Sequence, residues 1–228
     1  MLLADCGSCW AKIWNSDTNE LQIVQTKDII KNNNFVFDFA TGHSGKSKSK
    51  RHENELIALA EGALSLISDD NFTIVDVGSR DTKYIVFKNR KIAKIDWNLA
   101  CGSSTGATVE LLGHYYDVDF NALEPSESWV PVTCGVFGIE RILELISQGY
   151  EPEKGVSMFI HGVVRNIFYL VGEPKKLYLS GGFCENICFI KTLSKYCKVY
   201  PMGRTVLIQG LYNLLNYQNK EIFKKSKS

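Results

Sequence analysis

The sequence lacks a long apolar run, an excess of charge of either sign and a low-complexity linker. No hydrophobic segment approaches the ~20 residues that a membrane-spanning helix needs, so we expect no membrane partner. The 26 basic and 25 acidic residues leave a net charge of +1, which gives no electrostatic reason to expect nucleic acid as a partner. The basic run from Lys46 to Arg51 is local and favours a solvated loop.

The N-terminal residues also lack the pattern of a secretory signal. Met1 leads directly into a strand-like run, without a charged region followed by an apolar core. The seven cysteines, an odd number, favour reduced thiols or metal ligands over a disulfide framework. We therefore expect a cytoplasmic protein.

The length and composition are those of a globular protein. A chain of 228 residues with 45% hydrophobic and 22% charged residues can bury a proper core in one large domain or two small ones.

Two segments of the chain share the pattern Asp-x-Gly-Ser-x-x-x-Lys. They run from Asp5 to Lys12 and from Asp76 to Lys83, and each lies between apolar, strand-like runs. Either one alone could be an ordinary hairpin turn, because Asp and Gly are common turn residues. Two copies about 70 residues apart predict a duplicated structural unit.

Hydrophobic periodicity places strands and helices around these two turns. The expected strands cover residues 1–4, 11–14, 21–25, 35–39, 73–77, 84–87, 91–97, 176–179 and 199–200. The expected helices cover residues 54–68, 108–116, 137–147, 156–169, 186–194 and 209–217. Strands followed by helices, twice over, predict an α/β fold with two related halves, residues 1–70 and 71–204, and a closing helix at about 205–228 that returns to the first half.

The two turns carry the groups that ATP and Mg²⁺ require. Backbone N–H groups at glycine turns and hydroxyl donors bind phosphate, while carboxylates hold the waters of the metal or orient an attacking water. A third glycine turn, Ser180-Gly181-Gly182 running into Asn186, follows a strand and precedes a helix, where a backbone can approach a nucleotide closely. Such a turn is also a common plain connection.

A second nucleotide-binding pattern competes with this interpretation. Residues Ala40 to Ser47 match the relaxed form of a P-loop, follow a strand and precede a helix, and Asp76 could then end a Walker B strand. The stricter pattern requires Gly in place of Ala40. A P-loop also leaves the N-terminal repeat and the Ser-Gly-Gly turn unexplained.

The cysteines divide into three groups. Cys6-x-x-Cys9 has redox or zinc spacing, but no second pair completes a site, so coincidence within the turn is the simpler interpretation. Three further cysteines, at 184, 188 and 197, are most simply buried apolar residues.

Cys101 and Cys134 are each followed by small residues and then by an expected helix. The dipole of such a helix would stabilise a thiolate or an anionic iron–sulfur cluster. Two thiolates cannot complete a four-cysteine site, so a cluster would need two ligands from each chain of a homodimer. From spacing alone, buried free thiols are the favoured interpretation.

Taken together, these motifs resemble a known family. Residues 5–12, 76–83, 101–106, 134–138 and 180–186 are similar, in order, to motifs of the ATP-dependent activators of 2-hydroxyacyl-CoA dehydratases and the ATP-binding subunits of benzoyl-CoA reductase. The helix from Glu55 to Ala63 is similar as well. These proteins belong to the superfamily of actin, sugar kinases and acetate kinase.

The resemblance implies a fold and a function. It implies an actin-like ATPase fold, with ATP and Mg²⁺ in a cleft between two ribonuclease-H-like halves. It further implies a [4Fe-4S] cluster that bridges a homodimer and passes low-potential electrons, driven by ATP hydrolysis, from a ferredoxin or flavodoxin to a dehydratase- or reductase-type partner enzyme.

The resemblance also implies roles for individual residues. Asp5 and Asp76 would be catalytic, and Cys101 and Cys134 would hold the cluster. The remaining contacts to the nucleotide would come from Gly7, Ser8, Lys12, Gly78, Ser79, Asp81, Thr105, Gly106, Gly181, Gly182 and Asn186.

Three positions depart from the family's motifs. Ser104 stands where the family has Gly, Arg80 where it has Gln, and Thr41 to Ser44 match only in part. Two alternatives therefore stay open beside the activator, a small-molecule kinase of the same superfamily and a non-catalytic ATP-binding module, with a P-loop NTPase as a third. The sequence names neither the partner enzyme nor its acyl substrate.

Overall fold

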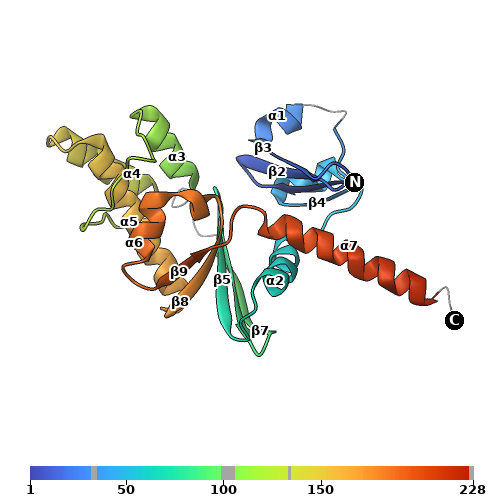
Figure 1. The fold of residues 1–228 in the computed structure, drawn as a ribbon. Coiled ribbons are helices and arrows are strands. Elements are labelled where there is room, and N and C mark those ends of the chain that lie inside the picture. The colour runs from blue at the N-terminus through green and yellow to red at the C-terminus, as the bar shows by residue number, and fades with distance from the viewer. Residues whose placement is uncertain (32–34, 99–105, 133–134, 226–228) are drawn as a thin grey trace. The chain divides into compact units, whose positions relative to one another are not determined.

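The computed structural model describes residues 1–31, 35–98, 106–132 and 135–225 (Figure 1). The chain forms two compact units. Unit 1 comprises Met1–Asp70 and Arg204–Ser228, and unit 2 comprises Asn71–Gly203. Unit 2 is one continuous segment, whereas unit 1 is assembled from both ends of the sequence.

Unit 1 is built on a four-stranded sheet of order β3-β2-β1-β4. Its strands are β1 (Leu2–Cys6), β2 (Trp10–Asn15), β3 (Glu20–Gln25) and β4 (Phe39–Thr41). The first three strands are antiparallel, and β4 runs parallel to β1. Side chains alternate between the faces of a strand, so Ala4, Cys6, Ala11 and Ile13 form one buried face, which packs on the α1 residue Ile29.

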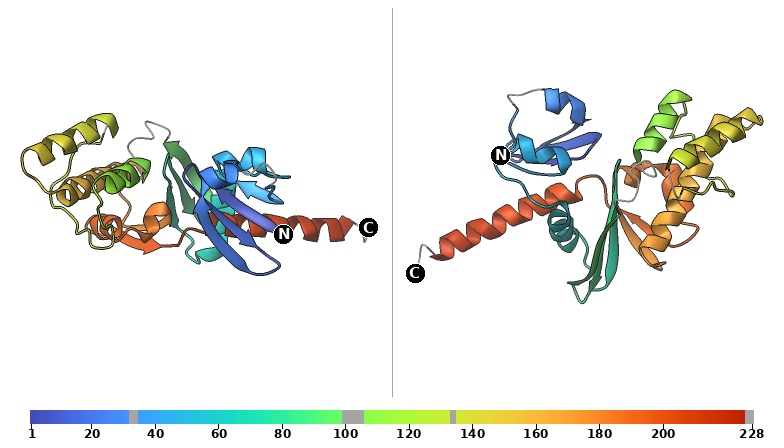
Figure 2. Two further views of the ribbon diagram at one scale, coloured as in Figure 1. Left: turned by 90° about the horizontal axis from the view of Figure 1, so that it is seen from above. Right: turned by 180° about the vertical axis from the view of Figure 1, so that it is seen from behind.

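Two long helices complete unit 1, together with the short helix α1 (Thr26–Lys31) and the 3₁₀ helix η1 (His43–Lys48). Asn54 caps α2 (Glu55–Leu66), because its Oδ1 accepts a 2.8 Å hydrogen bond from the Leu56 N–H. The C-terminal helix α7 (Val206–Lys225) crosses α2 (Figure 2). Glycines allow this close approach: a Cβ at Gly210 would lie 1.8 Å from the carbonyl oxygen of Ala58.

Unit 2 repeats the strand arrangement of unit 1 and adds one strand. Its sheet has the order β7-β6-β5-β8-β9. The strands are β5 (Phe72–Val77), β6 (Thr82–Lys88), β7 (Lys91–Asn98), β8 (Lys176–Gly181) and β9 (Lys198–Pro201). As in unit 1, a three-stranded antiparallel meander is followed by a strand parallel to its first member. This shared topology confirms the duplication predicted from the repeated motif.

The helices of unit 2 share one core with its sheet. They are α3 (Gly106–Tyr115), α4 (Gly135–Ser147), α5 (Pro152–Leu170), the 3₁₀ helix η3 (Gly182–Glu185) and α6 (Ile187–Leu193). The four α-helices lie on the same side of the sheet (Figure 1). Buried residues of α5, such as Phe159 and Val163, pack in one cluster with Val75, Val77 and Leu179 of the strands.

Most expected elements are confirmed, with one clear shift. The strand expected at residues 35–39 begins only at Phe39. Before it, Asp38 bonds to Leu2 of β1 through both its backbone N–H, at 3.0 Å, and its side-chain Oδ2, at 2.8 Å, and Phe37 pairs with Ser49 as an isolated bridge. The last helix begins at Val206, earlier than the periodic stretch 209–217 and close to the start of the closing helix expected at about 205–228. Within the described ranges, no helix is both long and apolar enough to cross a membrane.

Candidate nucleotide site

The first repeat folds into a turn that holds a buried ion pair. Asp5 lies near the end of β1 and Lys12 lies on β2, and the two residues are directly opposite each other in the sheet. Lys12 Nζ lies 2.7 Å from Asp5 Oδ2, and both side chains are buried. Gly7, in the turn between them, lies close to the backbone of Trp10: a Cβ on Gly7 would be 2.9 Å from the Trp10 carbonyl oxygen. Ser8 is exposed at the tip.

The second repeat has the same register but different ion pairing. Asp76 and Lys83 are directly opposite each other on β5 and β6, as Asp5 and Lys12 are in unit 1. Lys83 Nζ nevertheless donates to Asp81 Oδ1 at 2.5 Å, and Arg80 Nε lies 3.8 Å from the other oxygen of Asp81. Asp81 is therefore held between two cations at the turn. Gly78 closes the turn, with its N–H donating to the Asp81 carbonyl at 3.0 Å.

Asp76 accepts a hydrogen bond from a hydroxyl group. Ser180 lies beside Asp76 on the parallel strand β8, and its Oγ donates a 2.8 Å hydrogen bond to Asp76 Oδ2. Asp76 is 7% exposed and Ser180 is fully buried. The carboxylate is thus fixed in orientation by a group that the sequence analysis included only as part of a glycine turn.

Gly181 must be glycine for two reasons. Its φ of 88° is in the left-handed region, and a Cβ would lie 2.4 Å from the Val77 carbonyl oxygen. At Gly182 there is space for a side chain, because a Cβ added there would have no atom within 4 Å. The next predicted site residue, Asn186, caps α6 through its Oδ1, which accepts a 2.8 Å hydrogen bond from the Phe189 N–H.

Unit 1 contains a counterpart of this turn that the sequence analysis missed. Thr41 pairs with Asp5 as Ser180 pairs with Asp76, and Gly42 follows it with a φ of 87°. A Cβ at Gly42 would lie 2.3 Å from the Cys6 carbonyl oxygen. Each unit therefore has the same three parts: an Asp, a Gly-Ser turn and a left-handed glycine on the neighbouring strand.

The same comparison shows that the P-loop alternative is wrong. The segment from Ala40 to Ser47 is the unit 1 counterpart of the Ser180-Gly181-Gly182 turn, and the part containing Gly45, Lys46 and Ser47 forms the 3₁₀ helix η1. A P-loop lysine would instead open an α-helix after a phosphate-binding loop.

The turn of the second repeat is bonded directly to the start of α3. The Ala107 N–H donates to the Ser79 carbonyl at 2.9 Å, and the Gly106 N–H lies 3.4 Å from the Gly78 carbonyl. A Cβ at Gly106 would lie 3.1 Å from that same carbonyl oxygen. The predicted phosphate turn therefore contacts the helix that begins directly after the Cys101 segment.

The cysteines that the structure describes behave as buried thiols. Cys6, Cys184, Cys188 and Cys197 are buried, and Cys9 is half-buried, without a disulfide among them. Desolvation raises the pKa of Cys6 to about 12, and burial also raises the pKa of Cys188 and Cys197. Burial therefore favours the neutral thiol form of these three groups.

The predicted cluster ligands Cys101 and Cys134, together with Thr105, lie outside the described residues. Among the residues that are described, no three His, Cys, Asp or Glu side chains gather as a metal site. The segments that contain the two cysteines lead into α3 at Gly106 and α4 at Gly135. Two thiols per chain are half of the donor set of a four-cysteine cluster.

Sequence and structure comparisons identify the relatives of this chain. No family model matches it. The (R)-2-hydroxyglutaryl-CoA dehydratase activating ATPase of Acidaminococcus fermentans is 24% identical over 169 residues, which cover 69% of this chain and 65% of the relative. The match thus spans slightly less than two thirds of the relative's length.

Two solved structures share the fold over nearly the whole chain. The activator of 2-hydroxyisocaproyl-CoA dehydratase from Clostridium difficile, with bound ADPNP, has a TM-score of 0.77 and 17% identity, covering 99% of this chain and 98% of that one. The chain shares its fold with this dehydratase activator. Component A of the (R)-2-hydroxyglutaryl-CoA dehydratase from A. fermentans has a TM-score of 0.71 and 20% identity, covering 92% of this chain and 95% of that one. The family resemblance and the actin-like ATPase fold inferred from the motifs are confirmed.

Proposed function

We propose that this chain is an ATP-dependent reductive activator of an acyl-CoA dehydratase- or reductase-type enzyme. The observation that carries the proposal is the matched pair of turns: Asp5 and Asp76 are buried at equivalent registers of the two sheets, each beside a Gly-Ser turn and a left-handed glycine. The similarity to a dehydratase activating ATPase supports the choice of reaction.

In this proposal both turns bind the phosphates of ATP. Gly7 and Gly78 allow their backbones to approach phosphate oxygens, and the hydroxyls of Ser8 and Ser79 donate to them. Lys12 provides a positive charge. Further contacts to the nucleotide come from Thr105, Gly106, Gly181, Gly182 and Asn186, and the solved relative with bound ADPNP supports a nucleotide ligand of this kind.

The two buried aspartates share the chemistry of hydrolysis. Asp76, oriented by Ser180, accepts a hydrogen bond from the water that attacks the γ-phosphate. Asp5, paired with Lys12, holds waters of the Mg²⁺ ion that accompanies ATP. Asp81 is balanced by Lys83 and Arg80 and keeps the second turn in shape.

Cys101 and Cys134 are the proposed ligands of a [4Fe-4S] cluster shared with a second copy of the chain. When bound, the cluster supplies a one-electron carrier of low potential. A ferredoxin or flavodoxin is the proposed donor, and the partner enzyme is the acceptor. The backbone bonds between the Gly78-Ser79 turn and α3 would connect the nucleotide to the Cys101 segment.

Anaerobic purification tests the proposal. We expect a brown dimer with iron and sulfide in equal amounts and an ATPase activity. Cys101→Ser or Cys134→Ser should remove the iron and keep nucleotide binding, whereas Asp76→Asn should keep the iron and lose hydrolysis. Cys9→Ser is the matched control and should retain its iron.

Three results would contradict the proposal. One is a colourless monomer after reconstitution with iron and sulfide. A phosphorylated small-molecule acceptor without a cluster would indicate a kinase instead. Tight ATP binding without turnover, unchanged in Asp76→Asn, would indicate a non-catalytic nucleotide-binding module.

A further inference from the structure

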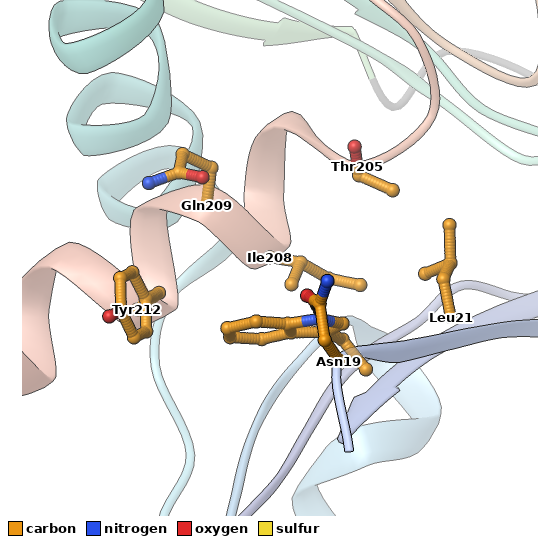
Figure 3. Close-up of a pocket in the computed structure, with 7 residues that line it drawn as sticks. Asn19, Leu21, Thr205, Ile208, Gln209 and Tyr212 are labelled. Atoms are coloured by element: carbon orange, nitrogen blue, oxygen red, sulfur yellow. Dashed lines mark hydrogen bonds between the residues drawn. The ribbon is translucent and has the colours of Figure 1, made fainter. Parts of the chain in front are cut away.

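Unit 1 contains a pocket that the proposed function does not use. It lies between the β2–β3 hairpin and the start of α7, and it encloses about 290 Å³ (Figure 3). The seven residues that line this hairpin–helix pocket are Trp14, Asn19, Leu21, Thr205, Ile208, Gln209 and Tyr212. All of them belong to unit 1.

The sequence spacing explains why these residues converge. Trp14 is two residues beyond Lys12 on β2 and directly opposite Leu21 on β3, so both side chains lie on the same face of the sheet. Thr205, Ile208, Gln209 and Tyr212 are spaced by three, one and three residues, which places them along one face of α7. The β2–β3 hairpin therefore forms one wall of the pocket, and the start of α7 forms the other.

Aromatic and aliphatic groups form its walls. The rings of Trp14 and Tyr212 meet edge to face, with their centroids 5.2 Å apart. Ile208 is buried at the base, and Leu21 forms the opposite side (Figure 3). A pocket with an indole ring in its wall and polar groups beside it favours a flat ligand that also carries polar atoms.

The side-chain amides of Asn19 and Gln209 each make one hydrogen bond within unit 1, and this bond fixes the orientation of the amide. Asn19 Oδ1 accepts a 3.2 Å hydrogen bond from Trp14 Nε1, which leaves the Asn19 amide N–H₂ for another acceptor. Gln209 Nε2 donates to Asn213 Oδ1 at 3.0 Å, which leaves the Gln209 carbonyl for another donor. Among the described residues, these two groups and the Thr205 hydroxyl have no hydrogen-bond partner. The pocket thus offers a donor, an acceptor and a hydroxyl.

No lining residue carries a charge. A carboxylate or an ammonium group would lose its hydration on entering the pocket and would gain no opposite charge. The chemistry of the pocket therefore selects a neutral ligand.

We propose that the hairpin–helix pocket binds a small, neutral, planar aromatic ring that carries an amide group. The ring lies against Trp14 and Ile208. The amide oxygen accepts from Asn19 Nδ2, and the amide N–H donates to Gln209 Oε1. This inference does not depend on the proposed function, because none of the seven residues belongs to the proposed nucleotide or cluster sites.

Nicotinamide is the probe that tests this, by ligand-detected NMR titration of the full chain. We expect saturable binding with a dissociation constant of about 1 mM or lower, as befits so small a ligand. Nicotinate, which replaces the amide with a charge, and cyclohexanecarboxamide, which is not planar, should each bind at least about tenfold more weakly.

Two variants locate the binding. Gln209→Met keeps the length of the side chain and removes its carbonyl, so it should weaken nicotinamide binding about tenfold. Gln22→Met makes the same change on β3 outside the pocket and should bind as the parent chain does. The proposal fails if nicotinamide shows no saturable binding by about 10 mM, ten times the expected constant. It also fails if nicotinate binds equally well, or if Gln209→Met binds like Gln22→Met.

Discussion

Ser180 and Asp76 are joined by a 2.8 Å hydrogen bond between neighbouring parallel strands, although they lie 104 positions apart in the sequence. Both residues belong to unit 2, and both are buried. The orientation of the Asp76 carboxylate is therefore set inside one sheet. In unit 1 the corresponding pair is Asp5 and Thr41, but there the carboxylate binds Lys12 and the threonine hydroxyl donates to the Glu53 carbonyl at 2.9 Å.

Ser180→Ala should lower the rate of ATP hydrolysis more than it weakens ATP binding. Loss of one hydrogen bond to a charged acceptor amounts to about 1.5–3 kcal/mol, or roughly a ten- to hundredfold lower kcat. Ser180→Thr retains the hydroxyl and should recover much of the rate. Steady-state kinetics of the three proteins measure this, and equal losses in Ser180→Ala and Ser180→Thr would contradict the role of the hydroxyl.

The buried pair of Asp5 and Lys12 should respond to substitution in a strongly non-additive way. Lys12→Met leaves the Asp5 carboxylate buried without its ammonium partner, so the free energy of unfolding should fall by about 3–5 kcal/mol. The double variant Asp5→Asn with Lys12→Met removes both charges and should recover most of that loss. Urea unfolding of the two single variants and the double variant gives the coupling energy.

Gly210→Ala should destabilise unit 1. The added Cβ would lie 1.8 Å from the Ala58 carbonyl oxygen, so α7 and α2 must move apart. Overpacking of this kind costs about 1–3 kcal/mol or more, against a gain of at most about 1 kcal/mol in helix propensity. Asn216→Ala, at an exposed position of α7, is the matched control and should be neutral or slightly stabilising. Thermal unfolding separates the two outcomes.

Stability should fall as the pH falls below about 6.5, in part because of His161. Its Nδ1 donates to the Ser126 carbonyl at 2.9 Å, and its Nε2 lies 2.6 Å from the Tyr196 hydroxyl. Burial lowers the pKa of His161, while the backbone hydrogen bond to Ser126 opposes this and the charge of Lys195 adds to it.

Because the pKa of His161 is lower in the folded chain than in the unfolded chain, acid destabilises the folded state. The unfolded chain takes up its proton at a higher pH than the folded chain, so the contribution is fully present above about 6.5 and is lost as the pH falls towards the lowered pKa of the folded state. Unfolding free energies at pH 7.5 and 5.5 measure it. His161→Gln, which retains a donor and an acceptor, should show a smaller difference between the two pH values.

The motifs predicted the two hairpin turns. Asp-x-Gly-Ser-x-x-x-Lys specifies a hairpin through neighbouring residues, so both turns could be found from the sequence. The ion pair of Lys83 with Asp81 does not follow from the shared pattern, because Asp81 stands at an unspecified position where the first repeat has Trp10. Thr41 to Ser44 matched the family's motif only in part and the adjacent Gly45-Lys46-Ser47 suggested a P-loop, so only strand pairing shows that Gly42 is equivalent to Gly181.

The discontinuity of unit 1 has a consequence for its cooperativity. Unit 2 is one continuous segment, whereas the parts of unit 1 are separated in the sequence by the whole of unit 2. The surface of α2 around Ala58 and Gly62 is covered only when Val206, Gly210 and their neighbours are in place. Completing unit 1 therefore requires a contact that spans more than 130 positions of the sequence, with the loop-closure entropy that such a contact costs.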